Sequence, residues 1–221
     1  MPYFCCIFLF LLFSLSANAV PPLTAPISVN QPAKGVLLVA KRSMPDPRFQ
    51  QTVILLLEHD AVRGTLGLVL NRPTDLTLAD VLLDLQSNDK PVQAKTLSLG
   101  WGGPVSREHL FMLLQVAEPA EESIPVFANI VWSASAKVLE TVLAEQVDKT
   151  AFRVFLGLAS WAPGQLDNEL AHSGWQLFLA QTAAVFGDND PVELWRYFID
   201  APVQVLAQNF AVIPITKKHA P

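Results

Sequence analysis

The chain contains almost no cysteine. Its only two, Cys5 and Cys6, lie within the first nineteen residues, too early and in the wrong context for a lipid-attachment site. The rest of the chain therefore offers no disulfide, no thiol nucleophile and no cysteine ligand for a metal.

Signatures of the common enzyme classes are also missing. The sequence has no Gly-x-Ser-x-Gly elbow, no His-Glu-x-x-His, no phosphate-binding loop and no Rossmann glycine pattern. A serine hydrolase could still be assembled from dispersed residues such as His59, His109 or His172, but no spacing favours it. We therefore expect neither a cofactor nor a metal, and the sequence alone names no reaction.

Positive charge is sparse and scattered. The chain has 15 Lys and Arg against 20 Asp and Glu, a net charge of −5 and a pI near 5.3. Lys217 and Lys218 form the one basic pair near the end of the chain. Proteins that bind phosphate backbones carry clustered basic residues, so we expect no nucleic-acid partner.

Residues 1–19 differ in character from the rest of the chain. Tyr3 to Leu15 is almost wholly apolar, and Ala17-Asn18-Ala19 supplies small residues at a plausible cleavage point. The apolar stretch is shorter than the roughly 20 residues that a bilayer crossing needs, and Pro21 and Pro22 follow it. We predict a signal peptide, no stable membrane span, and a periplasmic or secreted protein.

One alternative start of the chain remains open. No Lys or Arg precedes the apolar run, and a start at a non-Met codon, for instance at Val20 or Val29, would remove the leader. The protein would then be cytoplasmic.

The domain boundaries follow from composition. Residues 20–32 are rich in proline and carry no charge, which is typical of an extended linker. We place a single compact domain at 33–221, a length that suffices for one large core. Three apolar runs, Gly35 to Ala40, Thr52 to Glu58 and Thr65 to Asn71, are predicted to be strands buried on both faces.

The remaining elements alternate without a strict βαβ order, which favours an α+β fold. Further strands are predicted at Leu97 to Leu99, Leu110 to Val116, Val126 to Trp132, Phe152 to Ser160, Trp175 to Ala180 and, weakly, Val203 to Ile213. Helices are predicted after Thr77 to about Leu85, from Ser135 to about Val147, from Ala162 to Gly174 and from Pro191 to Phe198.

Several segments, taken together and in order, resemble the YqgE/AlgH family of bacterial proteins. They are GVLLVA with MPDPRF, VILLLEHD, GTLGLVLNRPTDLTLADVL, GGPV, SASAKVLE, FLGLASWAPGQLDNELAHSGW and Val-Phe-Gly with Trp195. The resemblance covers about Gly35 to Trp195. It implies a strongly curved or barrel-like, mostly antiparallel sheet with flanking helices, and a family of uncharacterised proteins sometimes described as putative transcriptional regulators.

This chain departs from the family pattern in two places. After GGPV the family continues with an Arg-Gly pair and a strand that ends in His, whereas here Ser106 to His109 leads to Leu113-Leu114-Gln115. The family's C-terminal Gly-His-Ala is not cleanly present, and most relatives look cytosolic.

Two polar groups at the ends of the first strands are candidate ligand-binding residues. Asp46 stands between Pro45 and Pro47, so its carboxylate either points into a cleft or bonds the backbone of its own turn. Asn71 and Arg72 follow a buried strand and either bind a carboxylate or phosphate, or form a turn.

Gly102 and Gly103 would let a ligand approach the backbone closely, although a tight turn explains this Gly-Gly pair equally simply. Glu58, His59 and Asp60 end a strand, where alternation separates His59 from the two carboxylates and disfavours a shared metal.

The third candidate group is Trp161, Gln165 and Glu169. Gln165 and Glu169 are four residues apart on the predicted helix and share a face, while Leu166 and Leu170 form an adjacent apolar stripe. Gln165 and Glu169 either line a polar pocket with Trp161 as a flat wall, or serve only to bind the helix to the sheet.

Three hypotheses for function follow. The first is a non-catalytic module that binds a small polar ligand or a protein partner near Asp46, Arg72 and Gln165/Glu169. The second is an enzyme of unknown class with Glu169 as general base, and the third is a regulatory protein whose function lies on its surface. We favour binding or regulation over catalysis.

Overall fold

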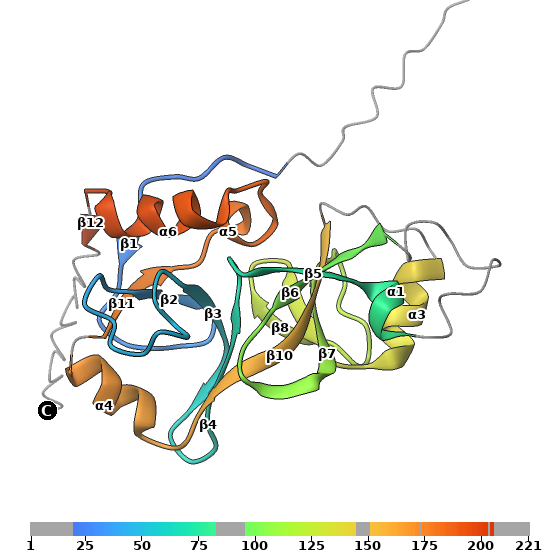
Figure 1. Ribbon diagram of the computed structural model, residues 1–221, viewed down its shortest axis with the longest axis horizontal. Helices are drawn as coiled ribbons and strands as arrows, with labels where there is room; N and C mark the ends of the chain where they lie inside the picture. Colours follow the sequence, from blue (N-terminus) through green and yellow to red (C-terminus); the bar gives the residue numbers. More distant parts are fainter. Residues whose placement is uncertain (1–19, 83–95, 145–150, 173, 203, 206–221) are drawn as a thin grey trace, which may run out of the picture.

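The computed structural model describes residues 20–82, 96–144, 151–172, 174–202 and 204–205. The predicted signal peptide, the helix beyond residue 82, the helix end beyond residue 144 and most of the weak C-terminal strand lie outside the described residues. Within them the chain forms an α+β domain (Figure 1).

The strands are β1 (Ile27–Ser28), β2 (Val36–Ala40), β3 (Val53–Asp60), β4 (Gly64–Val69), β5 (Pro73–Thr77), β6 (Ser98–Trp101), β7 (Val105–Gln115), β8 (Ile124–Phe127), β9 (Ile130–Ser133), β10 (Phe152–Trp161), β11 (Trp175–Leu179) and β12 (Gln204–Val205). The helices are α1 (Leu78–Val81), α3 (Ala136–Ala144), α4 (Gln165–Ala171), α5 (Thr182–Phe186) and α6 (Pro191–Asp200). None of these helices has the length and apolar character that a bilayer crossing requires.

The sheet is mostly antiparallel and curved, and it does not close into a barrel. Its order is β12-β1-β11-β2-β3-β4-β10-β7-β9-β8, with β6 pairing both β10 and β5. The parallel pairs are β1 with β12 and β6 with β10. The predicted α+β fold with a curved sheet is therefore confirmed, in its open form.

Strand β10 joins the two halves of the sheet. Its residues 152–158 pair with β7 on one side, and its last three residues, Ala159 to Trp161, pair with β4. The ladder shifts register at Gly157, which has a φ of 68°. At this point the turn between β6 and β7 crosses β10 so closely that a Cβ on Gly102 or Gly103 would lie 2.2 Å or 2.1 Å from backbone atoms of β10.

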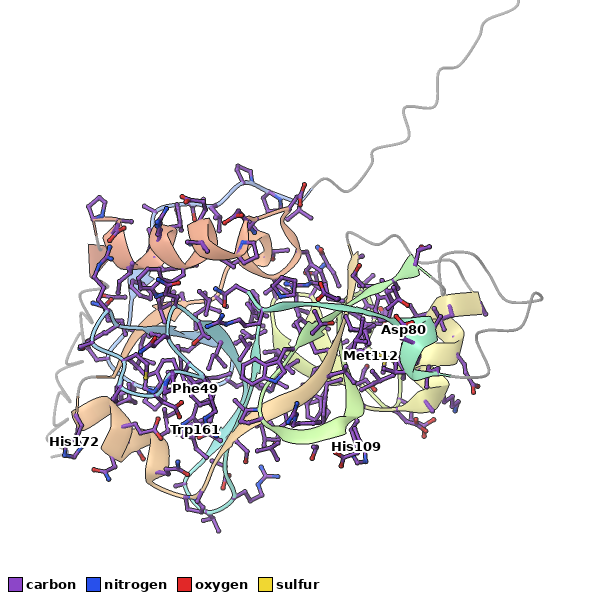
Figure 2. The ribbon with its side chains drawn as sticks, viewed as in Figure 1. Phe49, Asp80, His109, Met112, Trp161 and His172 are labelled. Carbon is purple, nitrogen blue, oxygen red and sulfur yellow. The ribbon has the colours of Figure 1, made fainter. Side chains whose placement is uncertain are left out.

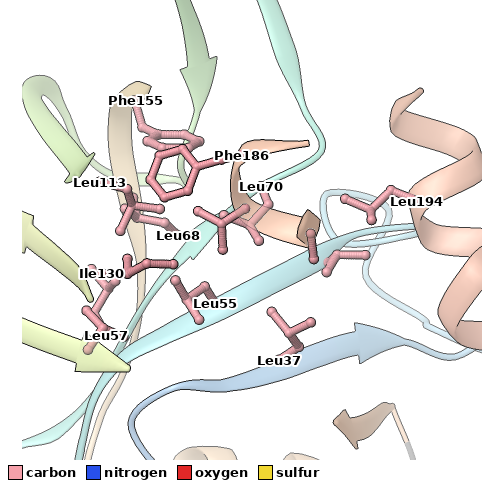
Figure 3. Packing of buried hydrophobic residues seen from close by; sticks show 14 of the residues in the cluster. Leu37, Leu55, Leu57, Leu68, Leu70, Leu113, Ile130, Phe155, Phe186 and Leu194 are labelled. Carbon is pink, nitrogen blue, oxygen red and sulfur yellow. The ribbon is translucent and has the colours of Figure 1, made fainter. Parts of the chain in front are cut away.

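Strands β2, β3 and β4 bury both faces, as their continuous apolar character predicts. Alternate residues point to opposite sides. Leu37 and Leu55 belong to a cluster with Phe186, Leu194 and Phe198 of α5 and α6. Figure 3 shows part of that cluster, with Leu55 and Leu68 at its centre.

The other face of the same strands packs against α4. Leu38, Ile54 and Leu56 form a second cluster with Leu166 of α4 and with Trp161. The helices α5 and α6 therefore cover one face of this half of the sheet and α4 covers the other (Figure 1).

Several boundaries differ from the sequence prediction for local reasons. The predicted strand Val126 to Trp132 is two strands, because Ala128 takes a left-handed conformation (φ 47°) and turns the chain. Strand β7 begins at Val105, and β5 and α5 were not predicted. Strand β5 starts with proline and is largely exposed, so it lacks the apolar signal of a strand.

The start of α1 follows the predicted Thr-x-x-Asp signal. Asp80 accepts hydrogen bonds from both the backbone N and the hydroxyl of Thr77, at 2.7 Å and 2.6 Å. The Asp80 carboxylate therefore satisfies the backbone N–H of Thr77, one of the N–H groups at the helix start that have no partner within the helix. These two hydrogen bonds also hold the pKa of the Asp80 carboxyl below its usual value.

Candidate functional site

The loop between β2 and β3 and the segment from the end of β10 to the start of β11 line one cavity of about 400 Å³. We call this cavity the tryptophan pocket. The residues that line it are Met44, Pro45, Asp46, Arg48, Phe49, Pro104, Val105, Ser160, Trp161, Gln165, Glu169, His172, Gly174 and Trp175. In Figure 2 Phe49 and Trp161 lie beside α4, and His172 lies at the end of that helix.

Glu169 is the hydrogen-bonding centre of the tryptophan pocket. One of its carboxylate oxygens, Oε2, accepts from the indole Nε1 of Trp161 and from that of Trp175, each at 3.0 Å. The other, Oε1, accepts from Gln165 Nε2 at 3.1 Å. The four side chains therefore form one connected network in which the carboxylate has three donors.

Gln165 also fixes the start of α4. Its Oε1 accepts from the backbone N of Ala162 at 3.0 Å, which ties the turn after β10 to the helix. Gly164 precedes the helix with a φ of 72°, a conformation that favours glycine. The helix and the strand end are thus locked together by the same residues that hold Glu169.

Aromatic rings form the apolar part of the pocket. The ring of Phe49 lies 6.4 Å from that of Trp161 in a stacked arrangement and 5.8 Å from that of Trp175 in an edge arrangement. Trp101 approaches the same phenylalanine at 6.3 Å. Trp161 and Trp175 are almost wholly buried, whereas Phe49 and Trp101 are half-buried. Phe49 therefore connects the β2–β3 loop to both tryptophans of the network.

Asp46 also lines the tryptophan pocket and forms an ion pair with Arg48. Arg48 donates from Nη2 to Asp46 Oδ2 at 2.6 Å and from Nε to Oδ1 at 3.1 Å, and its backbone N donates to Oδ1 at 2.9 Å. These bonds from Arg48 hold the pKa of the Asp46 carboxyl below its usual value. The Arg48 side chain is 62% exposed, so it remains accessible from solvent.

Because of this ion pair, we expect the free energy of unfolding to depend slightly on pH in the acidic range. Because the Asp46 pKa is lowered on folding from 3.8, its contribution is complete above that pH and is lost as the pH falls through the lowered value. We expect the urea midpoints of wild type and Asp46→Asn to differ by a constant amount from about pH 7 to 5 and to converge below about pH 4. A difference that stayed constant in strong acid would contradict this assignment.

The other candidate residues lie elsewhere. Asn71 is buried and bridges three backbone groups: Val53 N donates to its Oδ1, and its Nδ2 donates to Gln51 O and Pro191 O, all at 2.8 Å. Arg72 donates to Gln50 O at 2.6 Å. The structure therefore places Asn71 and Arg72 outside the tryptophan pocket, with backbone partners of their own.

Gly102 and Gly103 lie next to the pocket, before Pro104, but their Cα atoms face the backbone of β10. At the end of β3, His59 Nδ1 lies 2.8 Å from Thr65 Oγ1, and Asp60 accepts from the backbone N of Val62 and Arg63. Each of these groups stabilises a local turn or crossing.

Phe49, Arg48 and Trp175 belong to the site, although the sequence did not single them out. Phe49 and Arg48 stand directly after the Pro-flanked Asp46, and Trp175 opens the strand after α4. Two features of the sequence point to them. Trp161 and Trp175 stand at the two ends of the α4 segment, and Phe49 ends the Asp-Pro-Arg-Phe run.

Comparison with known proteins places this chain in a family. A family model described as AlgH-like matches residues 37–201. The chain belongs to the AlgH-like family. This confirms the resemblance inferred from the sequence.

Relatives and solved structures agree with this assignment. A UPF0301 protein of Pseudomonas syringae pv. tomato is 32% identical over 188 residues, which cover 85% of this chain and 95% of that protein. A UPF0301 protein of Alcanivorax borkumensis is 34% identical over 146 residues, covering 66% and 77%. The solution structure of the AlgH protein from Pseudomonas aeruginosa superposes with a TM-score of 0.65 at 30% identity, covering 87% of this chain and all of that one.

A more distant structure shares the fold. The crystal structure of protein DIP2367 from Corynebacterium diphtheriae has a TM-score of 0.59 at 25% identity and covers 75% of this chain and 85% of its own. The family is uncharacterised, and its members' names indicate no catalytic function.

Proposed function

We propose that this AlgH-like protein is a non-catalytic binding module that takes a small polar ligand in the tryptophan pocket. The observation that supports this most is the convergence of two distant segments, the loop around Asp46 and the segment from Trp161 to Trp175, on one open cavity. A cavity of about 400 Å³ falls within the size range of small-molecule sites.

The walls define the kind of ligand that fits. Phe49 and Val105 provide apolar surface, and Val105 is 43% exposed at the pocket. Arg48, Gln165 and His172 are exposed polar groups on the same walls. The pocket therefore favours a ligand with a flat apolar part against Phe49 and hydrogen-bonding groups toward Arg48 and Gln165.

The geometry around Glu169 supports binding over general-base catalysis. A general base needs a carboxylate oxygen within hydrogen-bond reach of the proton it removes. Both oxygens of Glu169 already accept from protein donors, and two of those donors belong to buried indoles. This arrangement keeps Glu169 in the wall of the pocket as an orienting group.

A surface-binding regulator draws less support from the described residues. Their exposed large apolar side chains come from different parts of the fold: Val62, Leu76, Val105, Ile124 and Val192. A partner surface is usually a contiguous apolar patch. We therefore give the small ligand preference over a protein partner.

We further propose that the protein is exported. The support is the apolar stretch in residues 1–19 and the small residues at Ala17 and Ala19. The mature protein would then begin at Val20 and act in the periplasm or outside the cell. Mass measurement of the protein made in its own host tests this directly, because removal of residues 1–19 changes the mass by the whole leader.

Native mass spectrometry with a pocket-filling variant tests the ligand proposal. Ser160 is exposed and lines the tryptophan pocket, so Ser160→Trp adds a large ring to the cavity without replacing a core residue. We expect wild type and Ser160→Ala, purified from the native host, to carry a bound small molecule and Ser160→Trp to lack it. Protein that carries no small molecule in any form, or the same one in all three, would contradict the proposal. A copurifying protein bound equally by all three would favour the surface regulator instead.

A further inference from the structure

A second and larger cavity lies on the other side of the sheet from the tryptophan pocket. It has a volume of about 670 Å³ and is bounded by the extended N-terminal segment, the end of β4, the start of β10, α5 and the start of α6. We call the segment Val20 to Thr24 the strap. Figure 1 shows the strap, in blue, running along α5 and α6.

Among the described residues that line this cavity, Arg153 is the one with a cationic side chain. Its Nη1 donates to Val185 O and its Nη2 to Leu70 O, both at 2.7 Å. The guanidinium lies 4.9 Å from the ring centroid of Phe155. Its hydrogen-bond acceptors in the described structure are thus two neutral backbone carbonyls, and no carboxylate neutralises it within ion-pair distance.

No carboxylate of the described residues lies within ion-pair distance to offset the removal of this charge from water. Removal from water lowers the pKa of the Arg153 guanidinium to about 10, so the side chain still carries its charge at neutral pH. A desolvated cation of this kind gains more than an exposed one from an anionic partner, because the surroundings screen the attraction less. Two of its five N–H groups are engaged by the protein, which leaves donors for a further acceptor.

The other polar groups on the walls do not replace Arg153. Asn71 uses its amide oxygen and nitrogen on three backbone groups, and Asn189 Nδ2 donates to Ala183 O at 2.7 Å. Asp188 is the one carboxylate among the described residues of the walls; it is exposed and outside ion-pair distance of Arg153.

The rest of the wall is apolar and held in place. Leu23, Leu70, Phe186 and Leu194 face the cavity, and Figure 3 shows the last three within the core cluster. The strap is fixed at Thr24, whose backbone N donates to Gln181 Oε1 at 2.7 Å and whose O accepts from Gln181 Nε2 at 2.8 Å and from the Tyr197 hydroxyl. The cavity therefore combines one partly buried cation with a preformed apolar wall.

We propose that this second cavity is a binding site for a small amphiphilic anion, with a carboxylate or phosphate head paired to Arg153 and an apolar part enclosed beneath the strap. The site is separate from the tryptophan pocket and does not depend on the function proposed for it.

Titration followed by NMR tests the proposal on the full chain as purified after expression. The Nε–H signal of Arg153 reports directly on the guanidinium. Hexanoate and hexyl phosphate are the probes, and hexylamine is the control that has the same tail with the opposite charge. We expect at least one anionic probe to shift the Arg153 signal saturably and hexylamine to leave it unchanged. The tighter of the two anions identifies the head group.

Variants on the rim avoid disturbing Arg153 itself, whose loss would leave two carbonyls without their donor. Pro21 and Asp188 are exposed and line the cavity, whereas Ala25 is exposed and does not line it. We expect Pro21→Glu to weaken the anionic probe about five-fold or more, and Asp188→Asn to tighten it, because one adds and the other removes a negative charge near the guanidinium. Ala25→Glu adds the same charge away from the cavity and should leave affinity nearly unchanged.

Two results would overturn the proposal. In the first, neither hexanoate nor hexyl phosphate shifts the Arg153 signal, or hexylamine shifts it as strongly as they do. In the second, Pro21→Glu and Ala25→Glu weaken binding equally, which would show that the probe responds to overall charge and not to this cavity.

Discussion

Replacing Gly103 with alanine should abolish the folded state. A Cβ at this position would lie 2.1 Å from the carbonyl carbon of Leu158 and 2.3 Å from the backbone N of Ala159. Neither atom belongs to a flexible side chain, so the turn between β6 and β7 would have to leave the central strand β10. We expect a loss of roughly 5 kcal/mol or more, which approaches the whole stability of a typical domain.

Gly164→Ala is the matched control. Gly164 also has a positive φ, 72°, but a Cβ there would meet nothing within 4 Å. The substitution should therefore cost only the left-handed conformation, about 1 to 2 kcal/mol. Urea unfolding followed by tryptophan fluorescence compares the two. Similar midpoints for both variants would show that the crossing at Gly103 can relax and is looser than described.

Glu169→Ala should produce the second largest loss. It removes the acceptor of two indole N–H groups that belong to tryptophans only 3% and 4% exposed. A buried donor left without a partner costs about 1 to 3 kcal/mol, so we expect the free energy of unfolding to fall by roughly 3 kcal/mol. Denaturant unfolding measures this, and the two indole N–H signals should move together in the NMR spectrum.

Glu169→Gln separates hydrogen bonding from charge. The amide oxygen of glutamine can still accept from both Trp161 and Trp175, because both donate to the same oxygen in wild type. The new amide nitrogen would face Gln165 Nε2, so one bond of the network is lost. We expect a cost of about 1 kcal/mol. A loss as large as that of Glu169→Ala would mean that the negative charge itself, and not the acceptor, holds the network.

Most of the core strands could be predicted because their apolar runs carry the signal directly. Strand β2 and the first five residues of β3 are uninterrupted apolar sequence, and all of these residues are buried. Strand β5 was missed because it begins with Pro73 and is exposed, and α5 because five residues are too few to show helical periodicity. Both depend on neighbours in the folded sheet for their stability.

The candidate site was predicted in part. The expected meeting of the Asp46 loop with the Trp161 helix start is present, and the two define one cavity. Their connection through Phe49, with ring distances of 5.8 to 6.4 Å, could not be derived from spacing, because which aromatic rings touch is decided by tertiary packing.

Arg153 is a residue whose importance the sequence itself indicates. It is the one charged residue in the otherwise apolar strand β10, FRVFLGLASW. A charge inside a buried strand needs a partner, and here two carbonyls from separate segments supply it. The sequence favoured Arg72 as the arginine that binds an anion, but Arg72 donates to Gln50 O. The arginine that lines the second cavity is Arg153.

The indole N–H signals of the protein test the central claim most directly. Titration of ¹⁵N-labelled protein with the small-molecule fraction of its native host should shift the signals of Trp161 and Trp175, which donate to Glu169 in the tryptophan pocket. The signal of Trp195, which donates to Ala40 O beneath α6, should stay in place. If the Trp161 and Trp175 signals remain fixed, or if only Trp195 responds, the tryptophan pocket is not where this protein binds its ligand.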